Sequence, residues 1–421
     1  MKNITKWRCS YPEHVAIPSF RDKSKGVNTR LEMELKSPDS AGFWCADYAI
    51  EAGAGYRIEA TMDVSGPFES YNYAGVIVTW KKTMSNDTQL QREYLDPETT
   101  KGKTVSFSSI FTAPENAEFA EIRLYAKWMK LKVEWKDIDI RKVPVPEPRP
   151  VKVVTTKVIP KFSPSAIGEN VLQVGKLLRS ISDEVKNPDI ILFPENMLDR
   201  CVKGPLTKRA ETIPGPFTRF LSGWAKRLKC HIATTIHEKD RGRFYNTAFI
   251  VDRKGRIAGK YRKAHLTLSE LEAGILPGND FMVFKLDFGK VGFATCWDNW
   301  FMESSRMLRL KGAEMILFPL AGDVHEHLEH IWPARAIDNG LPLVVSVWQG
   351  EPKRPVPSRI YDGAGNKLAE TTENLGYTAA TIDLNKKHRT FWLSVGPSMG
   401  EGRSLFIRER RPDLYKCLTR M

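Results

Sequence analysis

The proline content of one short segment limits most strongly how this chain can fold. Every second residue from Pro144 to Pro150 is proline. Proline lacks a backbone N–H and fixes its φ angle, so this segment continues neither a helix nor a central strand. It favours an extended, semi-rigid chain instead. We therefore predict a linker over residues 144–150 that joins two domains, residues 1–143 and residues 151–421.

The residues before the linker carry strand patterns throughout. Residues 56–62 and 120–126 alternate between apolar and polar side chains, and residues 75–80 form a short, mostly apolar run. Glycine, proline, asparagine and aspartate separate these runs, as turns between strands require. The pattern is typical of an all-β sandwich.

After the linker, short apolar runs alternate with segments of helical periodicity. Ile190 to Phe193 is wholly apolar, as in a buried strand, and apolar residues then recur three or four positions apart between Phe217 and Leu228. Strands and helices that alternate in this way predict an α/β sandwich with its helices outside. Strands are predicted over residues 151–154, 190–193, 231–236, 244–251, 256–261, 291–295, 315–318 and 343–347, and helices over residues 171–185, 217–228, 303–311 and 331–339.

Membrane and secreted classes do not fit the sequence. No apolar run reaches the roughly 18–20 residues that a membrane-spanning helix needs. The first residues show no secretory signal pattern. The cysteines are scattered without a Cys-x-x-Cys pair, which agrees with free thiols in a reducing compartment. We expect a cytoplasmic protein without a membrane partner.

The formal net charge of +14 raises the question of a nucleic-acid partner. Basic and acidic residues nearly balance before the linker, so the excess belongs to the second half. The basic residues there are dispersed, and no recognisable nucleic-acid module accompanies them. We expect no nucleic-acid partner.

Three segments carry chemically useful side chains at the ends of predicted strands, namely Glu195, Lys263 and Cys296. Taken singly, these residues fit a first-turn helix acid, a surface lysine and a packed core thiol. Taken together they form a minimum set for attack on an amide carbon. A thiol needs a base before it is a good nucleophile, and the oxyanion that develops needs fixed positive charge or N–H donors.

The order of these segments resembles the nitrilase superfamily of carbon–nitrogen hydrolases. The chain reads Pro-Glu, then Arg-Lys-x-His-Leu with a following Pro-Gly, then Gly-x-x-x-Cys-Trp-Asp with a downstream glutamate. The resemblance covers most of residues 151–421 and implies a four-layer αββα fold. It implies Glu195 as general base, Lys263 as oxyanion stabiliser and Cys296 as nucleophile.

The same resemblance implies a supporting set around the three residues. The backbone N–H of Trp297 would complete the oxyanion hole. A second glutamate is expected between the lysine and the cysteine, and Glu272 fits that place, with Glu270 as the alternative. The motif segments add further substrate-binding or supporting candidates, which are His265, Asp298 and Glu303. The chain departs from the family at Met302, where a proline often stands before this glutamate.

The N-terminal half resembles jelly-roll modules of the carbohydrate-binding, galactose-binding-like type. The resemblance rests on a Gly-x-x-Tyr strand entry at residues 53–56, a Phe-Thr-Ala-Pro stretch at residues 111–114 and a Trp-x-Asp-Ile segment at residues 135–138. These motifs are degenerate, and a fold does not transfer its function. Carbohydrate binding is therefore open, and we favour a role in assembly or in capping the pocket.

Three histidines within six residues, His325, His327 and His330, suggest a zinc site. However, His325 and His327 share a face only on a strand, whereas His327 and His330 share one only on a helix. The predicted chemistry also needs no metal. We expect a polar pocket wall or a solvated loop there, no metal site and no cofactor.

The sequence therefore predicts a hydrolase that cleaves a non-peptide C–N bond in a small amide or N-carbamoyl compound, through a thioester on Cys296. Nitrile hydrolysis by the same three residues is one alternative, and a non-catalytic ligand-binding or assembly protein is another. The resemblance also implies a homodimer or higher homo-oligomer, in which the stretch from Phe391 to Met421 reaches across to the partner.

Overall fold

The computed structural model describes residues 5–65, 72–85, 88–163, 166–322, 325–348, 356–389 and 401–419, apart from the side chains of residues 325–327 and 419. The chain forms two compact units. The sandwich unit comprises Met1–Glu147 together with Lys387–Met421, and the α/β unit comprises Pro148–Lys386. The division near residue 147 falls inside the predicted linker, but the last residues of the chain belong to the first unit and not to the α/β unit.

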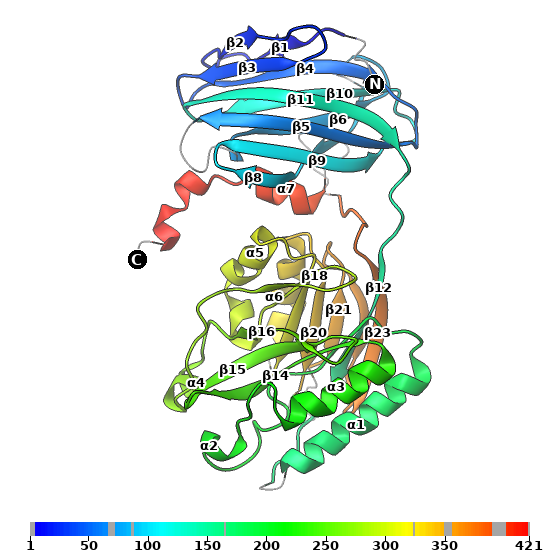
Figure 1. Cartoon of the computed structure of the whole chain (residues 1–421), viewed down its shortest axis with the longest axis vertical. Coiled ribbons are helices and arrows are strands. Elements are labelled where there is room, and N and C mark those ends of the chain that lie inside the picture. Colours follow the sequence, from blue (N-terminus) through cyan, green and yellow to red (C-terminus); the bar gives the residue numbers. More distant parts are fainter. Residues whose placement is uncertain are drawn as a thin grey trace. The chain divides into compact units, whose positions relative to one another are not determined.

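The sandwich unit contains two antiparallel sheets (Figure 1). The five-stranded sheet has the order β1 (Arg8–Ser10), β4 (Ala41–Ala49), β10 (Phe119–Lys127), β6 (Ala74–Lys81) and β7 (Gln89–Tyr94). The six-stranded sheet has the order β2 (Ser19–Asp22), β3 (Arg30–Leu35), β11 (Leu131–Val143), β5 (Gly55–Ser65), β9 (Thr104–Thr112) and β8 (Pro97–Lys101).

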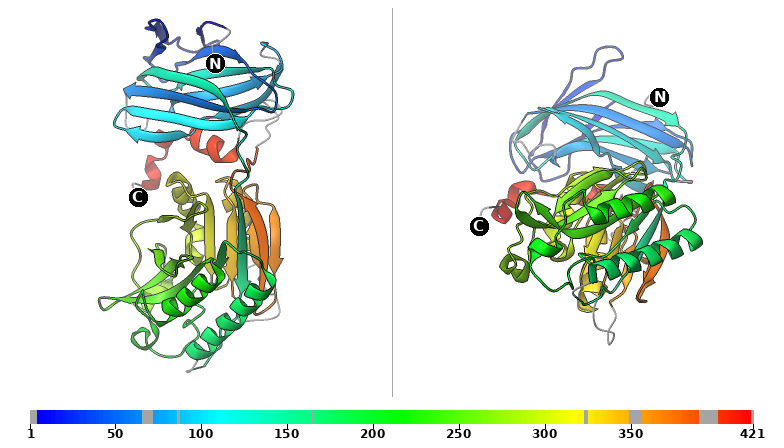
Figure 2. Two further views of the ribbon diagram at one scale, coloured as in Figure 1. Left: turned by 45° about the vertical axis from the view of Figure 1, so that its right-hand side comes forward. Right: turned by 60° about the horizontal axis from the view of Figure 1, so that its bottom comes forward.

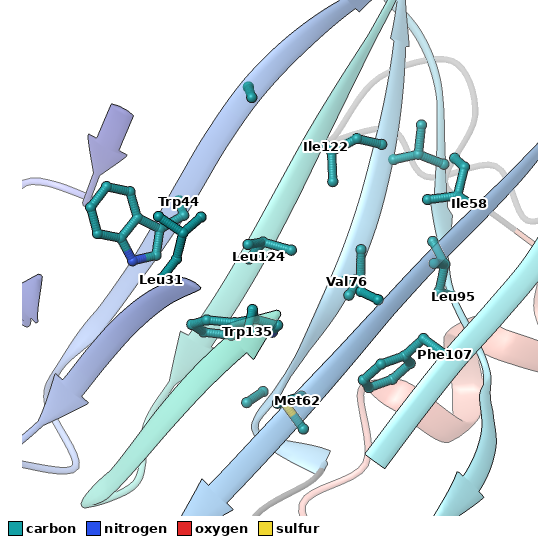
Figure 3. Packing of buried hydrophobic residues seen from close by; sticks show 14 of the residues in the cluster. Leu31, Trp44, Ile58, Met62, Val76, Leu95, Phe107, Ile122, Leu124 and Trp135 are labelled. Atoms are coloured by element: carbon teal, nitrogen blue, oxygen red, sulfur yellow. The ribbon is translucent and has the colours of Figure 1, made fainter. Parts of the chain in front are cut away.

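One apolar core fills the space between these sheets. Along β5 every second residue is buried, as expected for a strand with one face on the core. Trp80 and Trp135 come from opposite sheets and are fully buried. Figure 3 shows Trp135 and Met62 of the six-stranded sheet near Leu124 and Val76 of the five-stranded sheet. The aromatic residues of this unit therefore serve largely as core.

The α/β unit contains two six-stranded sheets, each named here after the candidate catalytic residue that follows one of its strands. The Glu195 sheet has the order β16 (Ile257–Arg262), β15 (Arg243–Val251), β14 (His231–Asp240), β13 (Ile190–Leu192), β12 (Pro150–Lys157) and β23 (Gly376–Asp383). The Cys296 sheet has the order β17 (Val283–Lys285), β18 (Lys290–Phe293), β19 (Met315–Leu320), β20 (Leu343–Val347), β21 (Ser358–Tyr361) and β22 (Lys367–Thr371).

Helices cover the outer face of each sheet in this unit, which gives four layers (Figure 2). The helices α1 (Ala166–Glu184) and α3 (Pro216–Leu228) pack on the Glu195 sheet. The helices α5 (Met302–Leu310) and α6 (His325–Ile337) pack on the Cys296 sheet. Buried side chains of both sheets meet between them. The predicted α/β sandwich with outer helices is present. Shorter elements are α2 (Leu206–Arg209), α4 (Leu268–Glu272) and η3 (Cys296–Trp300).

The packing of the sheets explains how distant segments can meet. β13 pairs in parallel with β12 and β14, and β18 pairs in parallel with β19. Their inward side chains form one cluster, in which Ile190 and Leu192 pack with Val291 and Phe293. The loops that leave β13 and β18 carry Glu195 and Cys296, as in other open α/β sheets.

The C-terminal segment packs on the sandwich unit. The helix α7 (Gly402–Arg408) places Leu405 against Ile77, Tyr94 and Tyr125 of the five-stranded sheet. It is followed by η4 (Pro412–Leu414) and η5 (Lys416–Thr419). The sequence predicted this segment, from Phe391 onward, as part of the catalytic half. Residues 390–400 lie outside the described residues, and the described remainder contributes to the core of the other unit.

Candidate active site

Glu195 lies in the loop after β13, three residues beyond Leu192, and is completely buried. Its Oε1 atom accepts hydrogen bonds from Lys263 Nζ, at 3.1 Å, and from Asn246 Nδ2, at 2.7 Å. The other oxygen, Oε2, accepts no hydrogen bond from the residues that the structure describes. One oxygen is thus held in place, and the second is available to take a proton.

Lys263 follows β16 and is also buried. Its ammonium group donates to Glu195 at 3.1 Å and to Glu270 Oε2 at 2.9 Å. Burial alone lowers the pKa of this lysine, but the charges of Glu195, Cys296 and Glu270 outweigh burial and raise its pKa above the ordinary value. The lysine therefore remains a fixed positive charge at neutral pH.

Glu270, and not Glu272, is the second glutamate that contacts Lys263. Glu270 is buried in the first turn of α4, whereas Glu272, two residues later, is exposed. Burial raises the pKa of Glu270, but Lys263 and the hydrogen bond from Asn246 outweigh it and lower the pKa to about 2. The sequence analysis preferred Glu272, and the structure places its alternative beside Lys263 instead.

The reason for this placement is local. Thr267 caps α4 with its side chain, and Glu270 reaches back to accept a hydrogen bond from the Thr267 backbone N–H at 2.9 Å. Thr-x-x-Glu is the capping-box pattern, which turns the glutamate back over the start of the helix. That pattern is visible in the sequence and could have identified Glu270.

Asn246 is a site residue that the sequence analysis missed. It lies on β15, opposite His237 of β14, and is fully buried. Its Nδ2 atom donates to Glu195 Oε1 and Glu270 Oε1, both at 2.7 Å. A buried polar residue near the start of the apolar stretch that ends at Val251 was the available signal.

Cys296 begins the 3₁₀ helix η3, three residues after the end of β18 at Phe293. Its φ angle is +47°, a left-handed conformation that is uncommon for residues other than glycine and often marks functional sites. Burial raises the pKa of the thiol to about 12, with Glu195 adding to the increase and Lys263 opposing it. The resting cysteine is therefore a neutral thiol next to a base.

Asp298 ties the Cys296 turn to the Lys263 segment. One oxygen accepts hydrogen bonds from the Thr295 backbone N–H at 3.0 Å and from the Tyr261 hydroxyl at 2.7 Å. The other accepts one from the His265 backbone N–H at 2.9 Å. Asp298 and His265 thus contact each other and hold the two loops together, which makes them positioning residues in this geometry.

The described residues contain no group of three or more histidine, cysteine, aspartate or glutamate side chains arranged to hold a metal ion. His325 and His327 begin α6, but their side chains lie outside the described part of the chain. His330 is exposed on the same helix. Within the same described residues, no helix combines the length and apolar character needed to cross a bilayer.

Comparison with known proteins identifies the family of this chain. The pattern of the carbon-nitrogen hydrolase family matches residues 155–389, which is more than half of the chain. The chain belongs to the carbon–nitrogen hydrolase family. It is 29% identical over 276 residues to the citrullinase of Francisella tularensis, a match that covers 59% of this chain and 92% of that protein. It is 28% identical over 286 residues to the N-carbamoylputrescine amidase of Solanum lycopersicum, covering 63% and 95%.

A solved structure supports the same assignment at the level of the fold. The carbon–nitrogen hydrolase from Helicobacter pylori G27 matches with a TM-score of 0.55 at 23% identity. The match covers 65% of this chain and 99% of that one. The α/β unit therefore has the nitrilase-type fold that the sequence resemblance implied.

Two further predicted residues lie outside the acidic and basic cluster of this carbon–nitrogen hydrolase. The Trp297 side chain is half-buried and packs against Trp300, with ring centres 4.9 Å apart. Glu303 is exposed in the first turn of α5.

Arg335 of α6 donates to the backbone oxygens of Asn299, at 3.0 Å, and Trp300, at 3.1 Å, and so secures the loop after the cysteine.

Trp348 is another residue that the sequence analysis missed in this hydrolase. It lies directly after β20, and its indole N–H donates to the backbone oxygen of Glu195 at 2.8 Å. The Cys296 sheet thereby supports the loop that leaves the Glu195 sheet. No short sequence motif indicates this contact, because it joins residues that are far apart in the sequence.

Proposed function

We propose that this protein hydrolyses the C–N bond of a small amide or N-carbamoyl compound through a thioester on Cys296. The observation that carries the proposal is the grouping of a half-buried thiol, Cys296, with a buried ammonium and two buried carboxylates, namely Lys263, Glu195 and Glu270. The family and the names of the two relatives, a citrullinase and an N-carbamoylputrescine amidase, support this class of substrate.

The reaction begins from a protonated thiol, because the pKa of Cys296 is far above neutrality. Oε2 of Glu195 takes the thiol proton as the sulfur attacks the carbonyl carbon and a C–S bond forms. The carbonyl electron pair moves onto oxygen. The ammonium of Lys263 and the backbone N–H of Trp297 stabilise this oxyanion.

The C–N bond then breaks, and Glu195 returns its proton to the leaving nitrogen. Ammonia or an amine departs, and the acyl group remains on sulfur. A water molecule gives a proton to Glu195 as it attacks the thioester carbon, and the C–S bond breaks. The acid product leaves, and the proton held by Glu195 restores the Cys296 thiol, so that each proton transfer is balanced over the cycle.

The neighbours of the cluster support this division of roles. Glu270 stays ionised and pairs with Lys263, so the lysine acts as fixed charge and not as a proton donor. Glu195 shares that lysine through one oxygen only, which leaves the second oxygen for proton transfer. The amide nitrogen of Asn246 donates to both carboxylates and so fixes their positions relative to each other.

The N-terminal module enters this proposal as a jelly roll that contributes no catalytic residue. We favour a role in assembly over carbohydrate binding. Trp44, Trp80 and Trp135 fill the core, and Leu405 covers Tyr125, so these aromatic rings are not displayed for a sugar. A homodimer or higher homo-oligomer belongs to the same proposal, and sedimentation of the full chain tests it.

The direct test replaces the nucleophile. Cys296→Ala should lower ammonia release from simple amides and ureido acids by a factor of at least about 10³, because no other group can form the thioester. Cys230→Ala is the control, since it removes a buried thiol from the same unit that is not part of the proposed cluster. A Cys296→Ala rate within about tenfold of wild type would contradict the mechanism. Hydrolysis of nitriles alone would favour the alternative substrate.

A further inference from the structure

Arg200 lies on the loop that carries Glu195 and is tied to the site by two contacts. Its backbone N–H donates to the Asn196 oxygen at 3.0 Å. Its guanidinium carbon lies 6.0 Å from the ring centre of Trp348, the residue whose indole N–H holds the Glu195 backbone. An arginine over an aromatic face has a defined orientation and gains some stability from the contact.

The guanidinium charge is not used to hold the fold. Arg200 makes no ion pair with any carboxylate that the structure describes, whereas Lys263 and Arg209 on neighbouring segments do. The neighbouring Asp199 is engaged elsewhere, with His237 at 2.6 Å and Arg209 at 3.4 Å. Arg200 is therefore a cation without a described anionic partner.

The charge nevertheless lies within electrostatic reach of the reacting groups. Burial of the guanidinium lowers the pKa of Arg200, but Glu195, Cys296 and Glu270 outweigh burial and raise it. All three belong to the proposed catalytic cluster. The ammonium of that cluster, on Lys263, is already paired with Glu195 and Glu270. Arg200 thus offers a second positive charge beside the site that is free to meet an incoming anion.

We propose that Arg200 binds a carboxylate at the far end of the substrate, so that the enzyme selects N-carbamoyl amino acids or half-amides of dicarboxylic acids over neutral or cationic amides. This inference rests on the proposed function of the same site. A guanidinium presents paired N–H donors that match both oxygens of a carboxylate. An ammonium at that end of the substrate would be repelled.

The test compares matched substrates that differ only at this end. N-Carbamoyl amino acids of increasing chain length are paired with N-alkylureas of the same length, and half-amides with simple amides. For the wild-type enzyme, kcat/KM should be higher for the carboxylate member of each pair. Arg200→Gln should raise KM for the carboxylate member by a factor of about 10–100, with kcat and the neutral member little changed. Arg200→Lys should recover part of the loss.

Arg227→Gln is the matched control, because Arg227 also covers a tryptophan, with its guanidinium carbon 5.1 Å from the Trp224 ring centre, but does so on α3. Arg227→Gln should leave kcat and KM unchanged for both the carboxylate and the neutral member of each pair. An equal loss in kcat on carboxylate and neutral substrates after Arg200→Gln would overturn the proposal and indicate an effect on the reacting groups. A wild-type enzyme with no preference for the carboxylate member would overturn it as well.

Binding separates this inference from the proposed reaction. In the Cys296→Ala background, calorimetry should detect binding of the N-carbamoyl amino acids, and Arg200→Gln should weaken it about 10–100-fold. If the wild type released no ammonia or amine from any substrate but this dependence on Arg200 held, the proposed reaction would fail and the carboxylate site would stand. Equal affinity for the N-carbamoyl amino acids with and without the Arg200 guanidinium would contradict the proposed carboxylate site.

Discussion

The protonation state of Cys296 determines how the proposed reaction can start. Its raised pKa means that almost no thiolate exists at neutral pH. The rate of reaction with a small neutral methanethiosulfonate should therefore rise about tenfold for each pH unit and show no plateau below pH of about 10. Mass spectrometry of the Cys296 peptide gives this rate. A plateau near neutral pH would indicate a preformed thiolate and remove the need for Glu195 as base.

Also at the residue scale, Glu270 and Glu272 give a sharp comparison. Glu270→Gln should lower kcat by a factor of about 10² or more, because Lys263 loses one carboxylate partner and then pairs more strongly with Glu195, which weakens that base. Glu272→Gln should leave kcat unchanged, since that side chain is exposed. Steady-state kinetics of both variants decide the matter, and equal losses would mean that the contact with Lys263 is unimportant.

At the scale of elements, the sequence predicted those that have a clear apolar period. The strands Ile190–Leu192 and Met315–Leu320 are wholly buried. Their continuous apolar sequences therefore predicted them. The short helix α4 was missed, because it has a single turn and its only signal is the capping box at Thr267. The strand β23 was missed as well, since its burial is irregular and it contributes to the sheet through pairing with β12.

The residues of the candidate site also divide into those with a local sequence signal and those without one. Glu195, Lys263 and Cys296 stand in motifs whose order survives in the linear sequence, and the structure brings them together. Asn246 and Trp348 act through contacts between elements that are distant in sequence, so no local pattern could reveal them. Residues that form the cluster were predictable, and residues that hold it in position were largely not.

At the scale of the whole molecule, the two ends of the chain belong to the same compact unit. The first boundary between the two units, at Glu147 and Pro148, lies within the proline-rich segment, and the sandwich unit also contains the other end of the chain. Arg408 of α7 is fully buried there and donates to the Ala74 backbone oxygen at 2.8 Å and to the Tyr125 hydroxyl at 3.2 Å. Gly75 has no side chain, and a Cβ atom there would lie 2.4 Å from Arg408. The fit of the helix is therefore close.

This arrangement predicts that the C-terminal segment stabilises the sandwich unit. Arg408→Ala should lower the free energy of unfolding of that unit by about 2–4 kcal/mol, because the buried hydrogen bonds and the packed side chain are lost together. Hydrogen exchange should quicken in β6 and β10 but not in β13 or β19, and thermal unfolding measures the size of the effect. Arg410→Ala is the control, since its described contact is the Tyr415 ring within the same segment. Unchanged exchange in β6 after Arg408→Ala would show that the sandwich folds without its C-terminal helix, and the segment would then be free to serve as the intersubunit arm that the family resemblance implies.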